Sequence, residues 1–136
     1  MMPTDDTLSL VLFSGTDDKL TAAGVLTVGA AAMGRKVNVL LQYWGLDAFR
    51  ADWILKEHGV APEAGEGGLE LVQRHGGQHW SELFRQAKEI SDVGIHACSL
   101  SMEMFQITKD DLDPLVDDVE GVAAFFAEVD GPVTFI

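Results

Sequence analysis

The sequence predicts an α/β fold, in which a mainly parallel five-stranded sheet is covered by helices on both faces. Short, almost wholly apolar runs alternate along the chain with segments of helical periodicity, which is typical of parallel sheets buried on both sides. A length of 136 residues and an apolar content of 47% suit one compact domain. A single cysteine excludes an internal disulfide and any multi-cysteine metal or iron–sulfur site.

The first apolar run, residues 8–13, predicts a buried strand. Residues 14–18 follow it and supply the Ser, Thr and Asp side chains that favour a helix start. We therefore expect a helix over 17–33, ended by Gly34. The 14–18 loop has no lysine in the P-loop position, and the helix glycines match no dinucleotide fingerprint. The small residues of this helix instead indicate close packing against the sheet or against another subunit.

The second strand is expected at residues 37–43, followed by a turn at 44–47 and a second helix over 47–57. The next stretch, residues 58–78, contains six glycines. This composition predicts a flexible loop with a short helical turn at 69–73.

The second half of the chain continues the alternation of helix and strand. We expect a helix over 79–90, a strand over 93–97 and a short helix over 99–105. A capped turn over 108–112, a strand over 116–119, a helix over 121–128 and a last strand over 133–136 should follow. Ligands of parallel sheets bind at the carboxyl ends of the strands. The segments 14–18, 43–47 and 98–101 should gather there, and this edge is the candidate site.

The charge of the chain limits its partners. Nine basic and 22 acidic residues give a net charge of −13, which disfavours nucleic acid and anionic membrane surfaces. The longest uncharged run, 20–34, has 15 residues, fewer than the roughly 20 that span a bilayer. With no signal-peptide start, we expect a cytoplasmic protein with a reduced cysteine. The nine carboxylates within 103–130 form either a solvated surface or a contact for a basic partner protein.

Cys98 is the candidate nucleophile, because it lies where a strand gives way to a helix. Backbone N–H groups and the helix dipole favour a thiolate at such a junction. His96 is two residues earlier, on the same strand face, and could add a positive charge. Position alone leaves two interpretations open, a reactive thiol or a small core residue.

Two further features have competing interpretations. His75 and His79 are spaced as on one helix face and could form a metal site with Cys98, but two glycines separate them and no zinc motif is present. We therefore expect neither a metal nor a cofactor. Trp44 could line a pocket near Cys98, pack in a subunit contact or pack in the core.

Several motifs occur in a characteristic order along the chain. They are an opening strand and helix at 11–34, Trp-Gly-Leu at 44–46, Ala-Cys-Ser-Leu-Ser-Met-Glu-Met at 97–104, Gly-Val-Ala-Ala-Phe at 121–125 and Val-Thr-Phe-Ile at 133–136. Together they resemble the DsrE/DsrF-like family, small proteins of sulfur metabolism. The resemblance spans nearly the whole chain apart from the 58–78 loop.

This resemblance implies a three-layer α/β/α sandwich that assembles as homotrimers or hexamers. It also implies that Cys98 carries sulfane sulfur as a persulfide, as a sulfurtransferase-like carrier, and exchanges it with sulfur-donor and acceptor proteins or small polysulfides. Family motifs often continue with Met-Gly-Ile, where this chain has Phe105-Gln106-Ile107. Because the chain has no second cysteine, a persulfide must leave by intermolecular transfer.

In this hypothesis Cys98 is the reacting residue and the three strand ends form its surroundings. The expected pocket and tuning residues are His96, Ser99, Ser101, Ser14, Gly15, Thr16, Asp17, Trp44 and Gly45. The alternative is a non-catalytic oligomeric binding module, in which Cys98 is inert and the pocket holds a small ligand or the tail of a partner protein.

Overall fold

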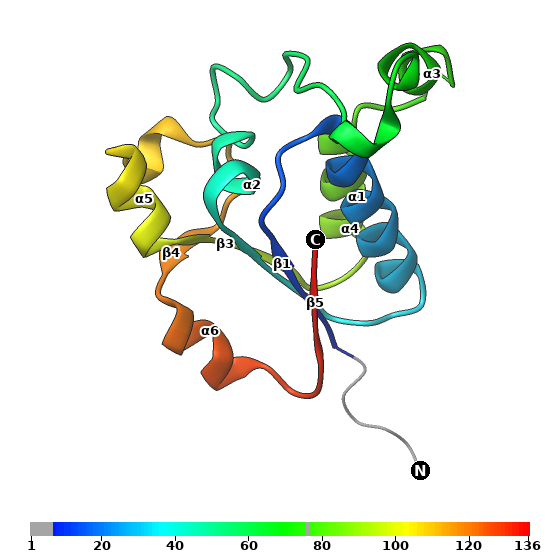
Figure 1. The fold of residues 1–136 in the computed structure, drawn as a ribbon. Coiled ribbons are helices and arrows are strands. Elements are labelled where there is room, and N and C mark those ends of the chain that lie inside the picture. Colours follow the sequence, from blue (N-terminus) through cyan, green and yellow to red (C-terminus); the bar gives the residue numbers. More distant parts are fainter. Residues whose placement is uncertain (1–6, 76) are drawn as a thin grey trace.

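The computed structural model describes residues 7–75 and 77–136. Its centre is a five-stranded sheet in the order β4-β3-β2-β1-β5 (Figure 1). The strands are β1 (Leu8–Leu12), β2 (Val37–Leu41), β3 (Val93–Cys98), β4 (Asp118–Glu120) and β5 (Val133–Phe135). Every neighbouring pair is parallel, so the predicted α/β fold with its parallel sheet is confirmed.

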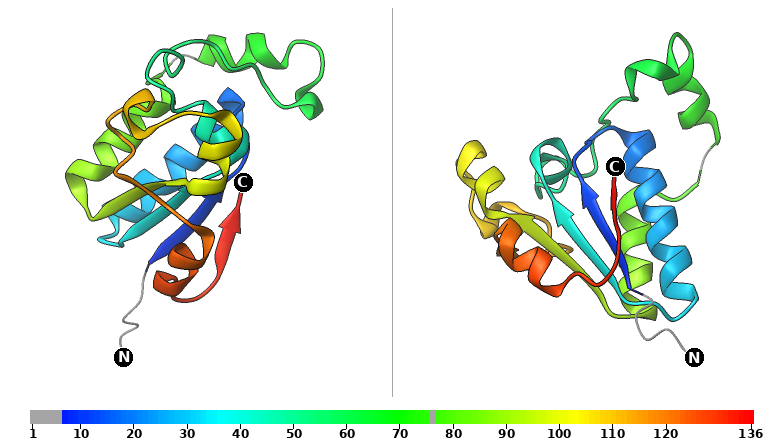
Figure 2. Two further views of the ribbon diagram at one scale, coloured as in Figure 1. Left: turned by 90° about the vertical axis from the view of Figure 1, so that its left-hand side faces the viewer. Right: turned by 60° about the horizontal axis from the view of Figure 1, so that its bottom comes forward.

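Helices connect the strands and cover both faces of the sheet. They are α1 (Asp17–Ala32), α2 (Tyr43–Asp47), α3 (Gly68–His75), α4 (Trp80–Ile90), α5 (Ser99–Phe105) and α6 (Val122–Glu128), with 3-10 turns η1 (Pro62–Ala64) and η2 (Lys109–Asp111). Helices α1 and α4 lie side by side against one face, and α6 lies on the other (Figure 2). None of the described helices is long and apolar enough to cross a membrane.

Successive side chains of each strand point to opposite faces of the sheet, so the buried residues form two clusters. On the face toward α1 and α4, strand residues such as Leu12, Leu41 and Ile95 pack with Leu20 and Phe84 in the main core. The opposite face carries a small cluster. It consists of Val11, Leu40, Cys98 and Phe125. One face of the sheet therefore holds most of the buried apolar surface, which is the dominant source of stability.

Two predictions from local sequence are confirmed, the end of α1 at Gly34 and the capped turn over 108–112. Gly34 follows α1 with φ +79°, the left-handed conformation that glycine adopts without steric cost. At the turn predicted over 108–112, Thr108 and Asp111 form a reciprocal capping box around η2. Short-range chemistry is sufficient to specify both features.

The second helix predicted over 47–57 is wrong. The helix instead occupies Tyr43–Asp47, and turns follow it through residue 55. Residues 49–51 pair with 111–113: Ala51 N–H donates to the Asp111 carbonyl (2.9 Å) and Asp113 N–H donates to the Phe49 carbonyl (2.8 Å). These bonds between distant segments replace the ones that would extend a helix, so tertiary contacts override local periodicity.

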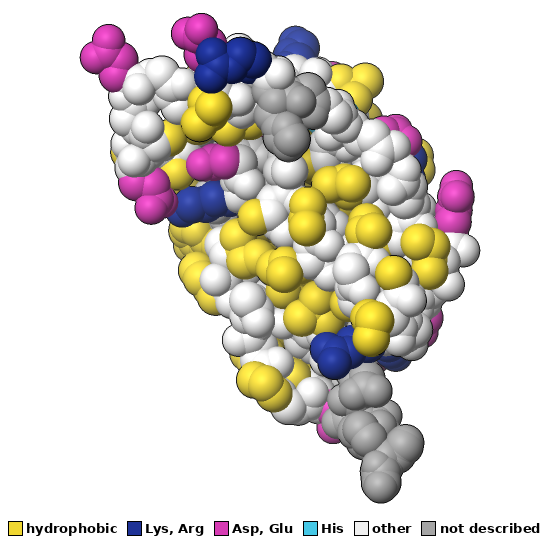
Figure 3. Space-filling view, turned by 90° about the vertical axis from the view of Figure 1, so that its right-hand side faces the viewer, with side chains coloured by type: hydrophobic (Ala, Val, Ile, Leu, Met, Phe, Trp, Pro, Cys, Tyr) yellow, Lys and Arg dark blue, Asp and Glu magenta, His cyan; other side chains and the backbone are white. Residues whose placement is uncertain are grey.

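The outward side of α1 is apolar, as Figure 3 shows. Val25, Leu26 and Met33 are all exposed there. Of the glycines, Gly24 packs tightly against Leu83 of α4, whereas no atom comes within 4 Å of the position that a side chain at Gly29 would take. Packing against α4 therefore explains Gly24 and leaves Gly29 on the open side of the helix.

Candidate functional site

The structure brings the three predicted strand ends together at one edge of the sheet. Gly45 N–H donates to the Phe13 carbonyl at 2.8 Å, and a side chain at Gly45 would collide with the Leu12 carbonyl. A side chain at Gly15 would likewise collide with the Trp44 carbonyl. These contacts require residues without a Cβ, and they fix the loop after β1 against the start of α2.

A third contact joins the start of α2 to α5. Tyr43 N–H donates to Ser101 Oγ at 3.0 Å. Tyr43 adopts φ +46°, a left-handed conformation that is uncommon for residues other than glycine. Its ring packs on Phe13 with centroids 4.9 Å apart. The backbone strain at this position is therefore maintained by contacts on both sides, as is common near functional sites.

Cys98 is the last residue of β3 and directly precedes α5. Its surface is only 1% exposed, and it packs with Val11, Leu40 and Phe125. Among the described residues, one side chain hydrogen-bonds the sulfur: Gln42 Nε2 donates to Cys98 Sγ at 3.8 Å. The thiol therefore has an amide donor at its side but is closed to solvent in this conformation.

His96 shares the sheet face of Cys98, but its ring interacts with β4. Its Nδ1 lies 2.6 Å from Asp118 Oδ1 and 3.9 Å from Glu120 Oε2. Its Nε2 would lie only 2.8 Å from a Cβ at Gly94, so the ring leans toward the start of β3 and away from Cys98. Burial raises the pKa of Glu120; the His96 side chain opposes this effect and the Asp118 carboxylate adds to it.

Asp17 and Trp44, predicted to surround Cys98, have their partners elsewhere. The Asp17 carboxylate accepts hydrogen bonds from His58 N–H (2.9 Å) and from the Trp80 indole N–H (3.2 Å), on the α4 side of the sheet. Trp44 is 54% exposed and packs edge-on against Phe105, with centroids 5.9 Å apart. Both side chains thus stabilise connections between elements.

Besides Ser101, the other three predicted hydroxyl residues lie at the same strand ends. Ser14 Oγ is 3.5 Å from Thr16 Oγ1 in the loop after β1, and Ser99 is exposed at the first turn of α5. Thr16 occupies the N-cap position of α1, but its side chain makes no capping bond to that helix. The loop after β1 is therefore held mainly by its backbone contacts.

The histidine pair at 75 and 79 does not form the continuous helix face that a metal site would need. His79 lies just before α4, and its Nδ1 accepts the Ser81 N–H at 3.1 Å, so it caps that helix. The side chain of His75 lies outside the described residues. Burial lowers the pKa of His79.

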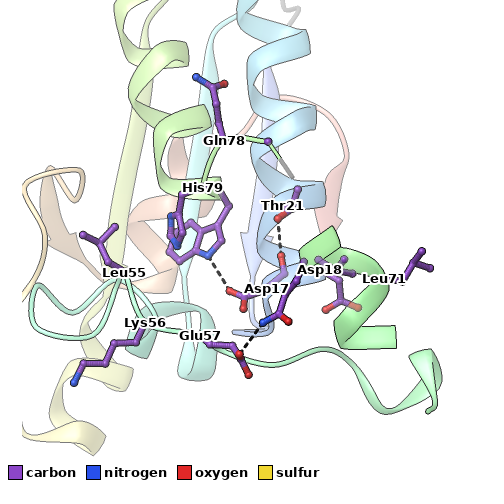
Figure 4. A pocket seen from close by; sticks show the side chains of 13 residues that line it. Asp17, Asp18, Thr21, Leu55, Lys56, Glu57, Leu71, Gln78 and His79 are labelled. Atoms are coloured by element: carbon purple, nitrogen blue, oxygen red, sulfur yellow. Dashed lines mark hydrogen bonds between the residues drawn. The ribbon is translucent and has the colours of Figure 1, made fainter. Parts of the chain in front are cut away.

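A cavity of about 670 Å³ lies beneath α3, in the stretch where only a flexible loop was expected. Its walls come from α1, the segment before α4, residues 55–57 and α3 (Figure 4). Leu55, Leu71, Val72 and Trp80 supply apolar surface. The apolar residues Leu69, Leu71 and Val72 inside the glycine-rich stretch are the sequence signal that could have indicated this wall.

The segment beside this cavity is tied down by the first turn of α1. Asp18 accepts the Ala61 N–H through both carboxylate oxygens, at 3.2 and 3.3 Å. Burial would raise the pKa of Asp18, but hydrogen bonds from the Thr16 side chain and the Ala61 backbone lower it below the usual value. The two acidic residues predicted as a helix cap thus also anchor residues 58–61.

Two groups near Cys98 were missed by the sequence interpretation. Gln42 directs its amide at the sulfur, and its signal was a polar residue directly after the apolar run of β2. The β4 carboxylates of Asp118 and Glu120 surround His96. No sequence signal placed β4 beside β3, because strand order is a non-local property.

Comparison with known proteins shows where the chain belongs. The uncharacterized protein YrkE of Bacillus subtilis (strain 168) is 26% identical in an alignment 148 positions long, which covers 90% of each chain. The structure of a protein of unknown function, MTH1491 from Methanobacterium thermoautotrophicum, matches 96% of both chains with a TM-score of 0.59 and 17% identity, which supports the fold. The sequence profile of the DsrE/DsrF/DrsH-like family matches residues 4–64 and 64–133. The chain therefore belongs to the DsrE/DsrF/DrsH-like family.

Proposed function

We propose that this protein is a sulfur carrier that holds sulfane sulfur as a persulfide on Cys98. Membership of the DsrE/DsrF/DrsH-like family suggests a sulfur-relay role. The observation that carries the proposal is the position of the thiol, at the carboxyl end of β3 with the Gln42 amide directed at its sulfur. In parallel sheets this end is where ligands bind and chemistry occurs.

The proposed chemistry is an exchange between two sulfur–sulfur bonds. The Cys98 thiolate attacks the outer sulfur of a donor persulfide, R–S–SH, whose S–S bond breaks with its electron pair leaving on the donor thiolate, R–S⁻. Cys98 becomes Cys98–S–SH, and an acceptor thiolate then attacks its outer sulfur and releases the Cys98 thiolate. Donor and acceptor are separate molecules, because Cys98 is the single cysteine of the chain.

Access to the thiol requires a local movement, and α6 is the element that can provide it. Phe125 is the single buried residue of α6, and it packs in the same cluster as Cys98. The strands on either side of α6, β4 and β5, have three residues each. An element with so little buried surface opens at a lower free energy than the whole domain, so lifting α6 exposes the sulfur.

The persulfide itself favours the open form. It adds a second sulfur about 2.05 Å beyond Cys98 Sγ, where the closed structure has packed side chains. Loading with sulfur should therefore shift α6 toward the lifted state. A carrier that opens when loaded presents its outer sulfur to the acceptor.

Mass spectrometry after incubation with inorganic polysulfide tests this proposal. The intact wild-type chain should gain mass in steps of one sulfur, and the matched Cys98→Ser variant should not. A dithiol reductant should remove the added mass from the wild-type chain. If the folded wild-type protein gains no sulfur, while its urea-unfolded form does, then Cys98 is a core residue and not a carrier.

A non-catalytic binding module is the second candidate function, and the cavity beneath α3 is the observation that favours it. Its apolar walls suit a small neutral ligand with aromatic or aliphatic surface. NMR with a set of neutral aromatic fragments would test this function. Shifts confined to the lining segments 17–21, 55–57, 71–73 and 77–80, unchanged in Cys98→Ser, would support it. An absence of such shifts at millimolar fragment concentrations would exclude it.

A further inference from the structure

A cluster of potential metal ligands lies on the sheet face that carries Cys98. One ligand atom each from His96 of β3 and from Asp118 and Glu120 of β4 fall within 4.8 Å of one another. The strand register explains the grouping, because His96 pairs with Asp118 and Cys98 pairs with Glu120. Residues two apart on a strand share a face, so both carboxylates of β4 project to the side of the imidazole.

The surroundings of the cluster leave its negative charge poorly compensated. The side chains of His96 and Glu120 are only 12% and 16% exposed, whereas Asp118 is 57% exposed. Within the described part of the chain, His96 is the one basic side chain that pairs with either carboxylate. The chain as a whole carries a charge of −13, so a bound cation would relieve the repulsion between the two carboxylates.

We propose that His96, Asp118 and Glu120 bind a divalent transition-metal ion. One imidazole nitrogen and two carboxylate oxygens form a donor set that suits Zn²⁺ or Mn²⁺. The ion would take the place of the hydrogen bond between His96 Nδ1 and Asp118 Oδ1, whose atoms are now 2.6 Å apart. Asp118 lies on the open side, so the ion enters there and keeps coordination positions for water or a small anion.

Gly94 has a defined part in this site. The His96 ring occupies the space beside Gly94, where a Cβ would come within 2.8 Å of Nε2 and 3.3 Å of Asn38 Oδ1. A methyl group at this position would push the ring aside without removing any ligand. Gly94→Ala therefore tests the geometry of the site separately from its ligands.

The test of the proposal is a calorimetric titration of the chelator-treated whole chain with Zn²⁺. Wild type should bind one equivalent, and His96→Ala and Glu120→Gln should each weaken binding at least about tenfold. Asp110→Asn removes an exposed carboxylate outside the cluster and should change the affinity less than twofold. Gly94→Ala should weaken binding although all three ligands remain. If His96→Ala does not fold by circular dichroism, Asp118→Asn serves in its place.

Two outcomes would overturn the proposal. If several ions bind weakly and the cluster variants match Asp110→Asn, the binding is diffuse attraction to an acidic surface. If Cys98→Ser abolishes binding and Co²⁺ gives a sulfur-to-metal charge-transfer band, the site is a thiolate site of different composition. Cys98→Ser should retain Zn²⁺ binding, so failure of the sulfur-carrier proposal and failure of the metal site are distinguishable.

Discussion

The two faces of the sheet differ in how firmly they are covered. Helices α1 and α4 bury one face together with the turns after α2, and the main core forms there around Phe49, Trp80 and Phe84. On the other face, α6 contributes Phe125 alone to a cluster of four residues that includes Cys98. The comparison teaches that one sheet can be firmly covered on one side and only lightly covered on the other. The candidate nucleophile lies on the lightly covered side, which is the side that we propose to open.

Phe84→Ala should have the largest effect on stability, because its ring lies at the centre of the firmly covered face. It is fully buried, and it contacts Phe49 with ring centroids 5.6 Å apart. Removing a buried Phe side chain costs about 3–5 kcal/mol. Urea denaturation should show this loss as a lower transition midpoint. A loss below about 1 kcal/mol would mean that this face is not the main source of stability.

Trp80→Phe should have an intermediate effect on the same face. It keeps an aromatic ring but removes the indole N–H that donates to Asp17 at 3.2 Å. A hydrogen bond to a charged group contributes about 1.5–3 kcal/mol, and we expect a loss in that range by urea denaturation. The alkylation rate of folded Cys98 should stay unchanged. A large increase in that rate would show that the two faces are not independent.

Phe125→Ala should cost less global stability than Phe84→Ala, although both side chains are buried. The short α6 can unfold locally around the deletion, so we expect roughly half of the Phe84→Ala loss. Cys98 alkylation in the folded protein should accelerate at least about tenfold, which corresponds to about 1.4 kcal/mol in the opening equilibrium. Equal stability losses for the two variants, with no change in the alkylation rate, would contradict the difference between the faces.

The smallest predicted effect is a pH dependence at His79. Burial lowers the pKa of His79, assisted by His58 and Arg85 and opposed by Asp17 and Glu82. The folded protein thus binds this proton less readily than the unfolded chain, whose pKa is about 6.5. The contribution of His79 to stability is present above that pH and is lost as the pH falls through its folded pKa.

His79→Asn isolates this effect, because Asn is also a good N-cap residue and can still accept the Ser81 N–H. The urea midpoint of the wild type should fall more between pH 7.5 and 5.5 than that of the variant. Parallel curves for the two proteins would exclude the titration of His79 as a cause.

The sequence predicted those parts of the fold that depend on local chemistry. The alternation of strands and helices, Gly34 after α1 and the Thr108–Asp111 capping box follow from short-range patterns. The helix expected over 47–57 failed because residues 49–51 bond to residues 111–113. The periodicity of residues 47–57 carries no information about hydrogen bonds to a segment about 60 residues later in the chain.

The candidate site also has a part that the local sequence predicts and a part that depends on distant elements. Sequence position was enough to place Cys98 and His96 on one face at the end of a strand. The covering of Cys98 by Phe125, and the pairing of His96 with Asp118, depend on β4 and α6 packing beside β3. Assembly as a trimer or hexamer stays a prediction, for which the apolar side of α1 offers one exposed surface (Figure 3).

The urea dependence of Cys98 alkylation in the native state tests most directly whether the thiol becomes accessible while the domain is folded. If α6 opens on its own, reaction below the unfolding transition reports an opening free energy well below that of global unfolding, and this value changes little with urea. We predict this result for the wild type, with a still smaller opening free energy for Phe125→Ala. An opening free energy and urea slope equal to those of global unfolding would show that Cys98 is reached through the unfolded chain, and would contradict its role as a carrier.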